Sequence, residues 1–435
     1  MGESAANPTG PAPAASFWQM VGWASFDWAN SAFFTLIQTF VFANYFIRSI
    51  ATDEAAGQTQ WALAIGGAGA VVAVTGPLLG AVADQGGRRK PWIAGFEVLC
   101  LAATAALWWV KPDSPVWFAL LLVAAGSFGL EAANIFYNAM LPELTHGQRL
   151  GRWSGWGWAL GYAGGLACLA IALVALVGYG DGGLVPKTEA RHVRSSFLLV
   201  AGWFALFSLP LFLVTPDMPG TGKRLGRAAW DGLHQLIDSA RQIRQYGHIV
   251  RFLIARLFYI DGLASIFAIG GVYASGVFDM TASEIILLGI GLNVTAGIGA
   301  FSLAWLDDWI GAKWTIALSL VGILLPGSAL VFIETEAWFW ACALTLGFFV
   351  GPVQSASRSY LARVAPPGLR TQAFGLYAFS GKATAMAGPL LISAVTEWTG
   401  SQRWGITPIF GFLAVGLAIL LTVPQADRAP AEPGS

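Results

Sequence analysis

The sequence predicts an all-α membrane protein with twelve transmembrane helices in two pseudo-symmetric six-helix halves. Three observations carry this prediction. The composition is too apolar for a soluble domain, about twelve apolar stretches are long enough to cross a bilayer, and three motifs recur in the same order in the two halves.

The composition decides the class of protein. Of 435 residues, 56% are hydrophobic and only 11% are charged, whereas soluble domains carry about 25% charged residues. The formal net charge is zero, which argues against nucleic acid as a partner. Cys100, Cys168 and Cys342 lie in apolar runs without ligand or catalytic spacing, so we expect no metal, no cofactor and no disulfide framework. A membrane enzyme is the weaker class, since no nucleophile and base are spaced for catalysis.

The apolar stretches set the order of elements along the chain. A helix needs about 20 apolar residues to span a bilayer, and only helices or closed barrels satisfy their backbone groups there. No alternating barrel pattern occurs, so each stretch is predicted to be helical. The predicted spans are 17–47, 59–83, 91–110, 115–140, 152–177, 195–215, 251–275, 283–305, 313–333, 336–360, 371–396 and 404–424.

The connecting segments predict the orientation. Residues 1–16 form an Ala/Pro-rich tail without the basic start of a signal peptide, and residues 425–435 form a second tail. Most Lys and Arg residues of the connectors fall on one side, which places both termini in the cytoplasm of a bacterial inner membrane. The longest and most basic connector, 216–250, separates the halves 17–215 and 251–424. Trp230, Leu233, Leu236, Ile237 and Ile243 recur in it at helical spacing, opposite Asp231, Arg241 and Arg244, so we expect a helix on the inner leaflet.

Internal repeats relate the two halves. "FDWANSAF" (26–33) returns as "IDGLASIF" (260–267), and "ADQGGRRK" (83–90) has a degraded copy, "DDWIGAK" (307–313). A third match aligns Asn138, Leu141, Gly155 and Gly161 with Arg358, Leu361, Gly375 and Gly381. Two parallel repeats of six helices place a binding site between the halves, near the membrane midplane.

Ionisable residues within the spans are the candidates for that site. Asp27, Asp261 and Lys382 lie at similar depths in three predicted helices, and Glu131 lies nearer the cytoplasmic half of a fourth. Such charges are costly in lipid, so they must meet inside the bundle, either as salt bridges or as a site for substrate or a proton. Glu131, Asn134 and Asn138 form a polar stripe on one helix face. The candidate substrate or proton residues are Asp27, Asn30, Glu131, Asn134, Asp261, Gln354 and Lys382.

One loop and several spans resemble a known family. "GAVADQGGRRKPW" (80–92) resembles the loop motif between the second and third helices of the major facilitator superfamily, whose Gly/Asp/Arg cluster locks and releases the halves. The stretches "FDWANSAFFTLIQTFVFANYF", "FYNAMLPEL", "SGWGWALGYAGG", "YIDGLASIFAIGGVYA" and 351–389 are similar to autophagy-related vacuolar effluxers and their bacterial relatives. With this motif, its second copy and two polar residues near the cytoplasmic ends, the candidate gating residues are Asp84, Gly87, Arg88, Arg89, Asn138, Asp308 and Arg358. For Arg358 an inner gate and simple snorkelling are both open.

The resemblance implies a monomeric secondary transporter in the bilayer. We expect it to move a small polar solute, an amino acid or similar zwitterion, by alternating access, with Lys382 and a carboxylate holding the empty site. Asp27 or Glu131 could carry a coupling proton, and sodium could take the same oxygens. A sugar, organic acid or betaine as substrate, a non-transporting receptor and a lipid scramblase are the alternatives.

Overall fold

The computed structural model describes residues 14–145, 147–177, 184–241, 243–383 and 387–426, and these residues contain helices but no strand. Most of both expected tails lies outside the described residues. The helices are α1 (Phe17–Ala32), α2 (Phe42–Ser49), α3 (Glu54–Gly86), α4 (Lys90–Ala106), α5 (Val116–Leu144), α6 (Leu150–Ile171), α7 (Arg191–Leu213), α8 (Leu225–Arg241), α9 (Gly247–Phe278), α10 (Ala282–Ser302), α11 (Ala304–Ile310), α12 (Ala312–Ala329), α13 (Glu336–Val364), α14 (Arg370–Ser380), α15 (Ala387–Thr399), α16 (Gln402–Gly405) and α17 (Thr407–Leu421).

The predicted all-helical membrane architecture is confirmed. Ten helices in the described part of the chain are long and apolar enough to cross a bilayer, and large apolar side chains such as Val74, Leu213 and Leu325 point outward, as they do in lipid. The other two expected spans are broken. The first consists of α1, a π-helix (Phe33–Phe40) and α2, and the eleventh is divided between α14 and α15. The number twelve therefore stays a prediction.

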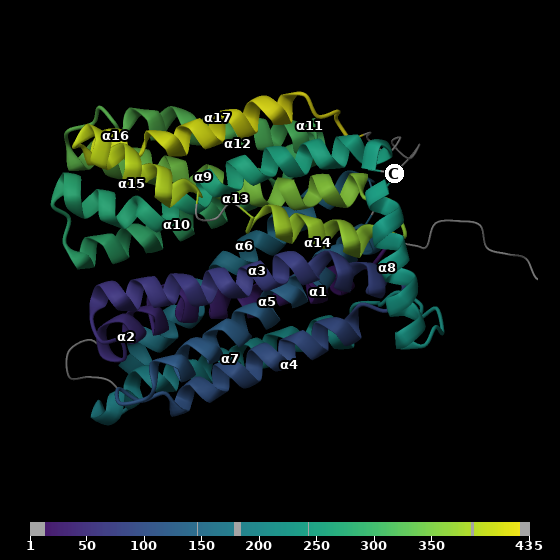
Figure 1. The fold of residues 1–435 in the computed structure, drawn as a ribbon, viewed down its shortest axis with the longest axis horizontal. Coiled ribbons are helices and arrows are strands. Elements are labelled where there is room, and N and C mark those ends of the chain that lie inside the picture. The colour runs from purple at the N-terminus through teal and green to yellow at the C-terminus, as the bar shows by residue number, and fades with distance from the viewer. Residues whose placement is uncertain (1–13, 146, 178–183, 242, 384–386, 427–435) are drawn as a thin grey trace, which may run out of the picture.

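The helices form two layers joined by α8. In Figure 1, α9 to α17 lie above α1 to α7, and α8 runs across one end of both layers. We call this end of the bundle, where the α3–α4 loop and the last turn of α17 also lie, the α8 end. We call the two layers the N-terminal and the C-terminal half.

Close helix contacts hold the halves together at the α8 end. α14 packs against α3, and α10, α11 and α13 pack against α6, whereas α15 packs chiefly against α9, α16 and α17 of its own half. Small residues permit these contacts, because a Cβ on Gly80 would lie 2.5 Å from the Thr371 carbonyl oxygen, and one on Gly155 would lie 2.6 Å from that of Ala300.

The long connector contains the helix α8, and the structure shows what this helix covers. α8 buries Ala228 and Gly232, and Gly232 faces the backbone of α3 at Val82. Trp230, Leu233 and Ile237 remain exposed, so an apolar stripe is available for the membrane interface. Ile243 lies beyond α8, in a short 3-10 turn. The helix therefore caps the end of the bundle as well as carrying an amphipathic surface.

Candidate functional site: charge pairs between the two halves

A buried ion pair joins the halves at Asp27. Arg358 of α13 donates from Nη1 to Asp27 Oδ2 of α1 over 3.0 Å, and the Tyr137 hydroxyl donates to the same oxygen over 2.9 Å. The Arg358 side chain is 3% exposed and that of Asp27 is 14% exposed. Burial excludes snorkelling for Arg358. The sequence placed Asp27, Asp261 and Lys382 at similar depths, whereas the cation that the structure brings to Asp27 is Arg358.

The guanidinium of Arg358 is held on every side. Its Nε donates to Ser154 Oγ over 2.9 Å, its Nη2 to the Ser154 carbonyl over 2.7 Å, and its Nη1 also to Asn138 Oδ1 over 3.2 Å. The rings of Trp23 and Tyr137 lie 5.0 and 5.8 Å from its Cζ. Hydrogen bonds, the ion pair and the aromatic rings together replace the water around this charge, so the Arg358 side chain is held in one position in this conformation.

A second pair between the halves is more open. Lys382, in the connection between α14 and α15, lies with Nζ 2.8 Å from Glu131 Oε1 of α5, and the two side chains are 32% and 29% exposed. Gly69 of α3 lies against the lysine stem, because a Cβ there would be 3.2 Å from Lys382 Cδ. Unlike Asp27 and Arg358, these two charged groups are accessible to a solute.

We call the contact between the N-terminal and the C-terminal half, around the Asp27–Arg358 and Glu131–Lys382 pairs, the seam. The polar stripe predicted on the fourth span faces this seam. Glu131 contacts Lys382, Asn134 Oδ1 accepts from Asn30 Nδ2 over 3.1 Å, and Asn138 accepts from Arg358. Gln354 of α13 donates to the Tyr162 hydroxyl of α6 over 3.4 Å, a further contact between the halves. Six of the seven candidate residues thus lie at or beside the seam.

Asp261, the seventh candidate, lies apart from these pairs. It is 2% exposed on α9, beside Gly388 of α15. In the described part of the chain, neither of its carboxylate oxygens has a cation or a hydrogen-bonding side chain, and the backbone N–H of Gly388 is the polar group beside it. The predicted meeting of Asp261 with Asp27 and Lys382 is therefore not seen in this conformation.

The first gating cluster crosses from α3 to α14. Asp84 accepts hydrogen bonds from the backbone N–H groups of Thr371 and Gln372, over 3.1 and 3.0 Å. Arg89 lies 3.7 Å from Asp84, donates to Thr371 Oγ1 over 3.1 Å, and lies 3.3 Å from Glu143. A carboxylate at a helix N-terminus satisfies free N–H groups and the helix dipole.

The second copy of the motif makes the equivalent contact, from the C-terminal half to the N-terminal half. Asp308 of α11 accepts from the N–H groups of Gly151 and Arg152 at the start of α6, over 2.8 and 3.2 Å. Arg363 lies 2.5 Å from Asp307 and 3.4 Å from Asp308. The degraded repeat therefore keeps the contact even though its sequence has diverged.

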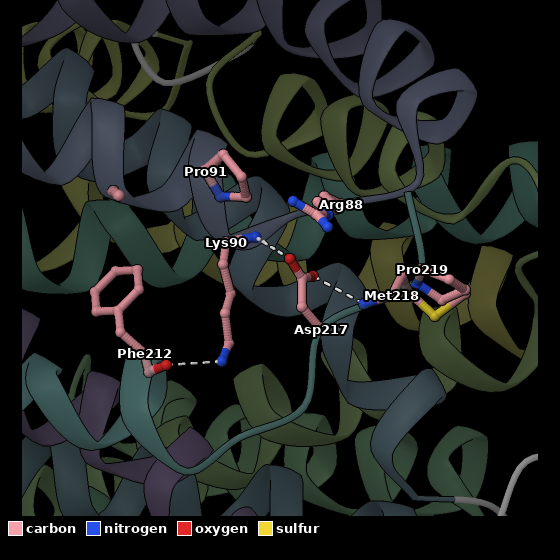
Figure 2. A pocket seen from close by; sticks show the side chains of 8 residues that line it. Arg88, Lys90, Pro91, Phe212, Asp217, Met218 and Pro219 are labelled. Carbon is pink, nitrogen blue, oxygen red and sulfur yellow. Dashed lines mark hydrogen bonds between the residues drawn. The ribbon is translucent and has the colours of Figure 1, made fainter. Parts of the chain in front are cut away.

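Arg88 and Gly87 serve the loop itself. Gly87 has φ +84°, which favours glycine, and Arg88 lines a pocket with Lys90, Phe212 and Asp217, shown in Figure 2. Asp217 accepts from the Arg89 and Lys90 N–H groups over 2.9 and 3.3 Å. The segment after α7 thus fixes the loop, and Arg88 takes no part in the contact of Asp84 with α14.

Several partners of the site were missed by sequence reasoning. They are Tyr137, Ser154, Glu143, Asp217, Asp307, Arg363 and Arg370. Asp307 could have been identified from the sequence, because it stands in the repeated motif beside Asp308. Tyr137 could also have been identified, because it adjoins Asn138 on α5. Ser154 and Asp217 could not, since their contacts depend on how distant helices cross.

Comparison with known proteins agrees with this geometry. Residues 146–432 match the family described as "Vacuole effluxer Atg22 like". The chain is 28% identical over 410 residues to an uncharacterized MFS-type transporter, YxiO of Bacillus subtilis, covering 93% of this chain and 94% of that protein. It is 25% identical over 307 residues to autophagy-related protein 22 of Cryptococcus neoformans, covering 65% of this chain. It spans only 53% of the length of that fungal relative.

Solved structures share the fold at low sequence identity. The proton:xylose symporter XylE has a TM-score of 0.70 at 13% identity, covering 94% of this chain and 95% of the other. The human organic anion transporter MFSD10 has a TM-score of 0.66 at 14% identity, covering 93% and 98%.

The family match, the similarity to an MFS-type transporter and the shared helical fold together identify a transporter of the major facilitator superfamily, an integral multi-pass membrane protein. The family match covers more than half of the chain. Within the superfamily, this protein belongs to the Atg22-like family of vacuole effluxers.

Proposed function

We propose that this protein is a secondary transporter that moves a small polar solute, an amino acid or similar zwitterion, by alternating access. The observation that carries the proposal is the accessible Glu131–Lys382 pair, whose two members come from opposite halves. A zwitterion carries both charges, so its carboxylate would bind Lys382 and its ammonium would bind Glu131. The solute would then replace the direct ion pair and change what holds the halves together.

The polar groups around this pair support a solute with hydrogen-bonding groups. Asn30 and Asn134 bond to one another beside Glu131, and Gln354 reaches Tyr162 across the seam. Each of these amides keeps donors or acceptors beyond the bond shown. The buried Asp27–Arg358 pair is proposed to report the state of the halves, because it can form only while α1 and α13 are close.

The proposal includes orientation, direction and assembly. We place the α8 end and both termini in the cytoplasm of a bacterial inner membrane, because the basic residues of the connectors gather there. The protein would act as a monomer, since one chain supplies both halves of the site. Efflux is the proposed direction, in keeping with the description of the family. The structure would then be closed on its cytoplasmic side.

Thermal-shift screening of the purified full-length protein tests the substrate class. Amino acids, betaines, organic acids and sugars would be compared, and we expect zwitterions to raise the melting temperature. Lys382→Met and Glu131→Gln should each abolish that rise. Lys111→Met is the matched control, because Lys111 forms an exposed ion pair with Glu189, 3.2 Å apart, away from the seam. A rise given only by sugars, or one that Lys382→Met retains, would refute the zwitterion site.

A further inference from the structure

Asp261 is a buried acidic group that the charge pairs between the halves do not use. It stands on α9 with 2% of its surface exposed, and among the described residues neither carboxylate oxygen has a cation or a hydrogen-bonding side chain, the backbone N–H of Gly388 being the polar group beside it. One turn further along α9, the hydroxyl of Ser265 is fully buried and has no hydrogen-bond partner among the described residues. Two neighbouring polar groups with so few partners are unusual, because each buried unsatisfied group costs about 1–3 kcal/mol.

The internal repeat provides the comparison. Asp27 and Ser31 occupy the positions in the N-terminal half that Asp261 and Ser265 occupy in the other. Asp27 has a cation and a hydroxyl donor, and Ser31 donates to the Asp27 carbonyl over 2.8 Å. The residue that matches Arg358 in the repeat is Asn138, which binds Arg358 and supplies no charge to Asp261. The repeat has therefore kept both carboxylates and only one cation for them.

The described residues of the elements packed against Asp261 supply no counter-ion. On its own helix, Arg256 donates instead to the Tyr377 carbonyl over 2.6 Å and to Ser380 Oγ over 2.7 Å, and Tyr259 bonds to Ser357. α17 carries no titratable residue, and Glu397 of α15 is nine residues beyond Gly388. On α14, the ring of Tyr377 packs against the guanidinium of Arg256. On α13, Arg358 and Arg363 are each paired with an aspartate, and the Tyr360 hydroxyl donates to the Pro424 carbonyl. Glu284 of α10 binds Thr281, Arg403 of α16 donates to the Ile333 carbonyl, and Lys382 binds Glu131.

A glycine lets α15 pack closely against Asp261 and Ser265. A Cβ on Gly388 would lie 1.9 Å from Ser265 Oγ and 3.5 Å from Asp261 Oδ2. The backbone of α15 therefore approaches the two polar groups closely, and no side chain of residue 388 intervenes. Gly388 follows Lys382 in the chain by six residues, so one segment joins the Glu131–Lys382 pair to Asp261.

We propose that Asp261 is the group that binds and releases the coupling proton, with Ser265 as its hydrogen-bonding neighbour, and this rests on the proposed transport function. An ionised carboxylate without a cation would be far more costly here than a neutral carboxylic acid. Asp27 and Glu131 already have cationic partners in this conformation, Arg358 and Lys382.

The proposed step is a proton transfer alone. An Asp261 carboxylate oxygen takes up a proton from water on one side of the membrane, and the resulting carboxylic acid returns it to water on the other. No bond of the solute forms or breaks. Deprotonation leaves a negative charge on Asp261, beside α15. This charge attracts Lys382, which precedes Gly388 of α15 by six residues, and so favours the separation of Lys382 from Glu131.

Infrared spectroscopy of the purified full-length protein tests the protonation directly. We expect a protonated-carboxyl stretching band near neutral pH that Asp261→Asn removes and Asp27→Asn retains. Glu97 is also buried, beside Ser208 and outside the contacts between the halves, and can give a carboxyl band of its own, so Asp261→Asn is also compared in a Glu97→Gln background, where the Asp261 band should be the one that remains and is then lost. Ser265→Ala should shift the frequency of the band. In the Glu97→Gln background, a band that survives Asp261→Asn unchanged would overturn the assignment.

Liposomes containing a pH-sensitive dye test the coupling. The wild type should change the lumenal pH in step with solute flux, and Asp261→Asn should exchange measurable solute with no pH change above that of protein-free liposomes. Proton movement that persists in Asp261→Asn would overturn the proposal while leaving transport intact. A wild type that moves no solute would overturn the proposed function, and the infrared band would still report the protonation of Asp261.

Discussion

Asp84 and Asp308 make the same contact from opposite halves of the protein. Each lies in the last turn of a helix of its own half and accepts two backbone N–H groups at the start of a helix in the other, α14 for Asp84 and α6 for Asp308. The contacts are reciprocal, and they do not share a partner. Together they close the α8 end, so they are the groups through which a change at this end would release the halves.

Removing either carboxylate should open the α8 end. Each Asp→Ala change loses hydrogen bonds to a charged group, worth about 1.5–3 kcal/mol, so the open state should gain roughly tenfold to a hundredfold. The reporter is a cysteine at Ser355, which is buried against Ser154, in a variant whose native cysteines are replaced. Its alkylation rate should rise with Asp84→Ala and with Asp308→Ala, and the two effects should add.

The controls for this gate are chosen from the same surface. Asp231→Ala removes a partly exposed carboxylate of α8 that lies 2.8 Å from Lys223 Nζ, a contact that holds the pKa of Asp231 below its usual range, and it should leave the alkylation rate unchanged. Arg88→Ala should have a smaller effect than Asp84→Ala, because Arg88 lies in the pocket of Figure 2. Equal rates in all four variants would exclude the gate.

α8 should act as a second brace across the same end. Gln235 bonds to Gln85 of α3, donates to the Gly368 carbonyl over 3.1 Å, and reaches Gln372 of α14 over 3.2 Å. Gln235→Ala should therefore raise the same alkylation rate, by about fivefold for a neutral bond near 1 kcal/mol. His234→Ala, one residue away on the exposed face, is the control. A Gln235→Ala rate no higher than this control would show that α8 does not brace the halves.

The sequence predicted most of the fold and part of the seam. Apolar length identified ten helices, and the repeat identified Asp84 with Asp308 and Gly155 with Gly375 as equivalent pairs; both pairs lie at contacts between halves. These inferences succeed because hydrophobic length and repetition are local properties of the chain.

The pairing of charges was beyond the sequence. Helix rise ranks residues by depth but gives neither helix rotation nor tilt, so Asp27, Asp261 and Lys382 were placed together. The break between α14 and α15 places Lys382 beside Glu131, and the depth of α13 places Arg358 beside Asp27. The π-helix after α1 was not foreseen either, because its residues have the same apolar composition as an α-helix.

Gly157 should be required for the Asp27–Arg358 pair. A Cβ at this position would lie 2.4 Å from Asp27 Oδ2 and 2.9 Å from Arg358 Nη2. Gly157→Ala should therefore push the pair apart and reduce transport, whereas Gly67→Ala, with no atom within 4 Å of the new Cβ, should not. Transport by both variants would be measured as flux into liposomes. Full flux through Gly157→Ala would show that the pair tolerates separation.

Asp27 and Arg358 should depend on one another for stability. Arg358→Met leaves the buried Asp27 carboxylate without its cation, which costs about 3–5 kcal/mol for a buried pair, so the melting temperature should fall sharply. In the double variant Arg358→Met/Asp27→Asn no charge is stranded, and part of the loss should return. Tryptophan fluorescence during heating of the detergent-solubilised protein measures both. If the double variant melts below the single one, the two residues are not energetically paired. If it melts higher and still binds solute, Asp27 is structural; if it melts higher and no longer binds, Asp27 belongs to the transport site.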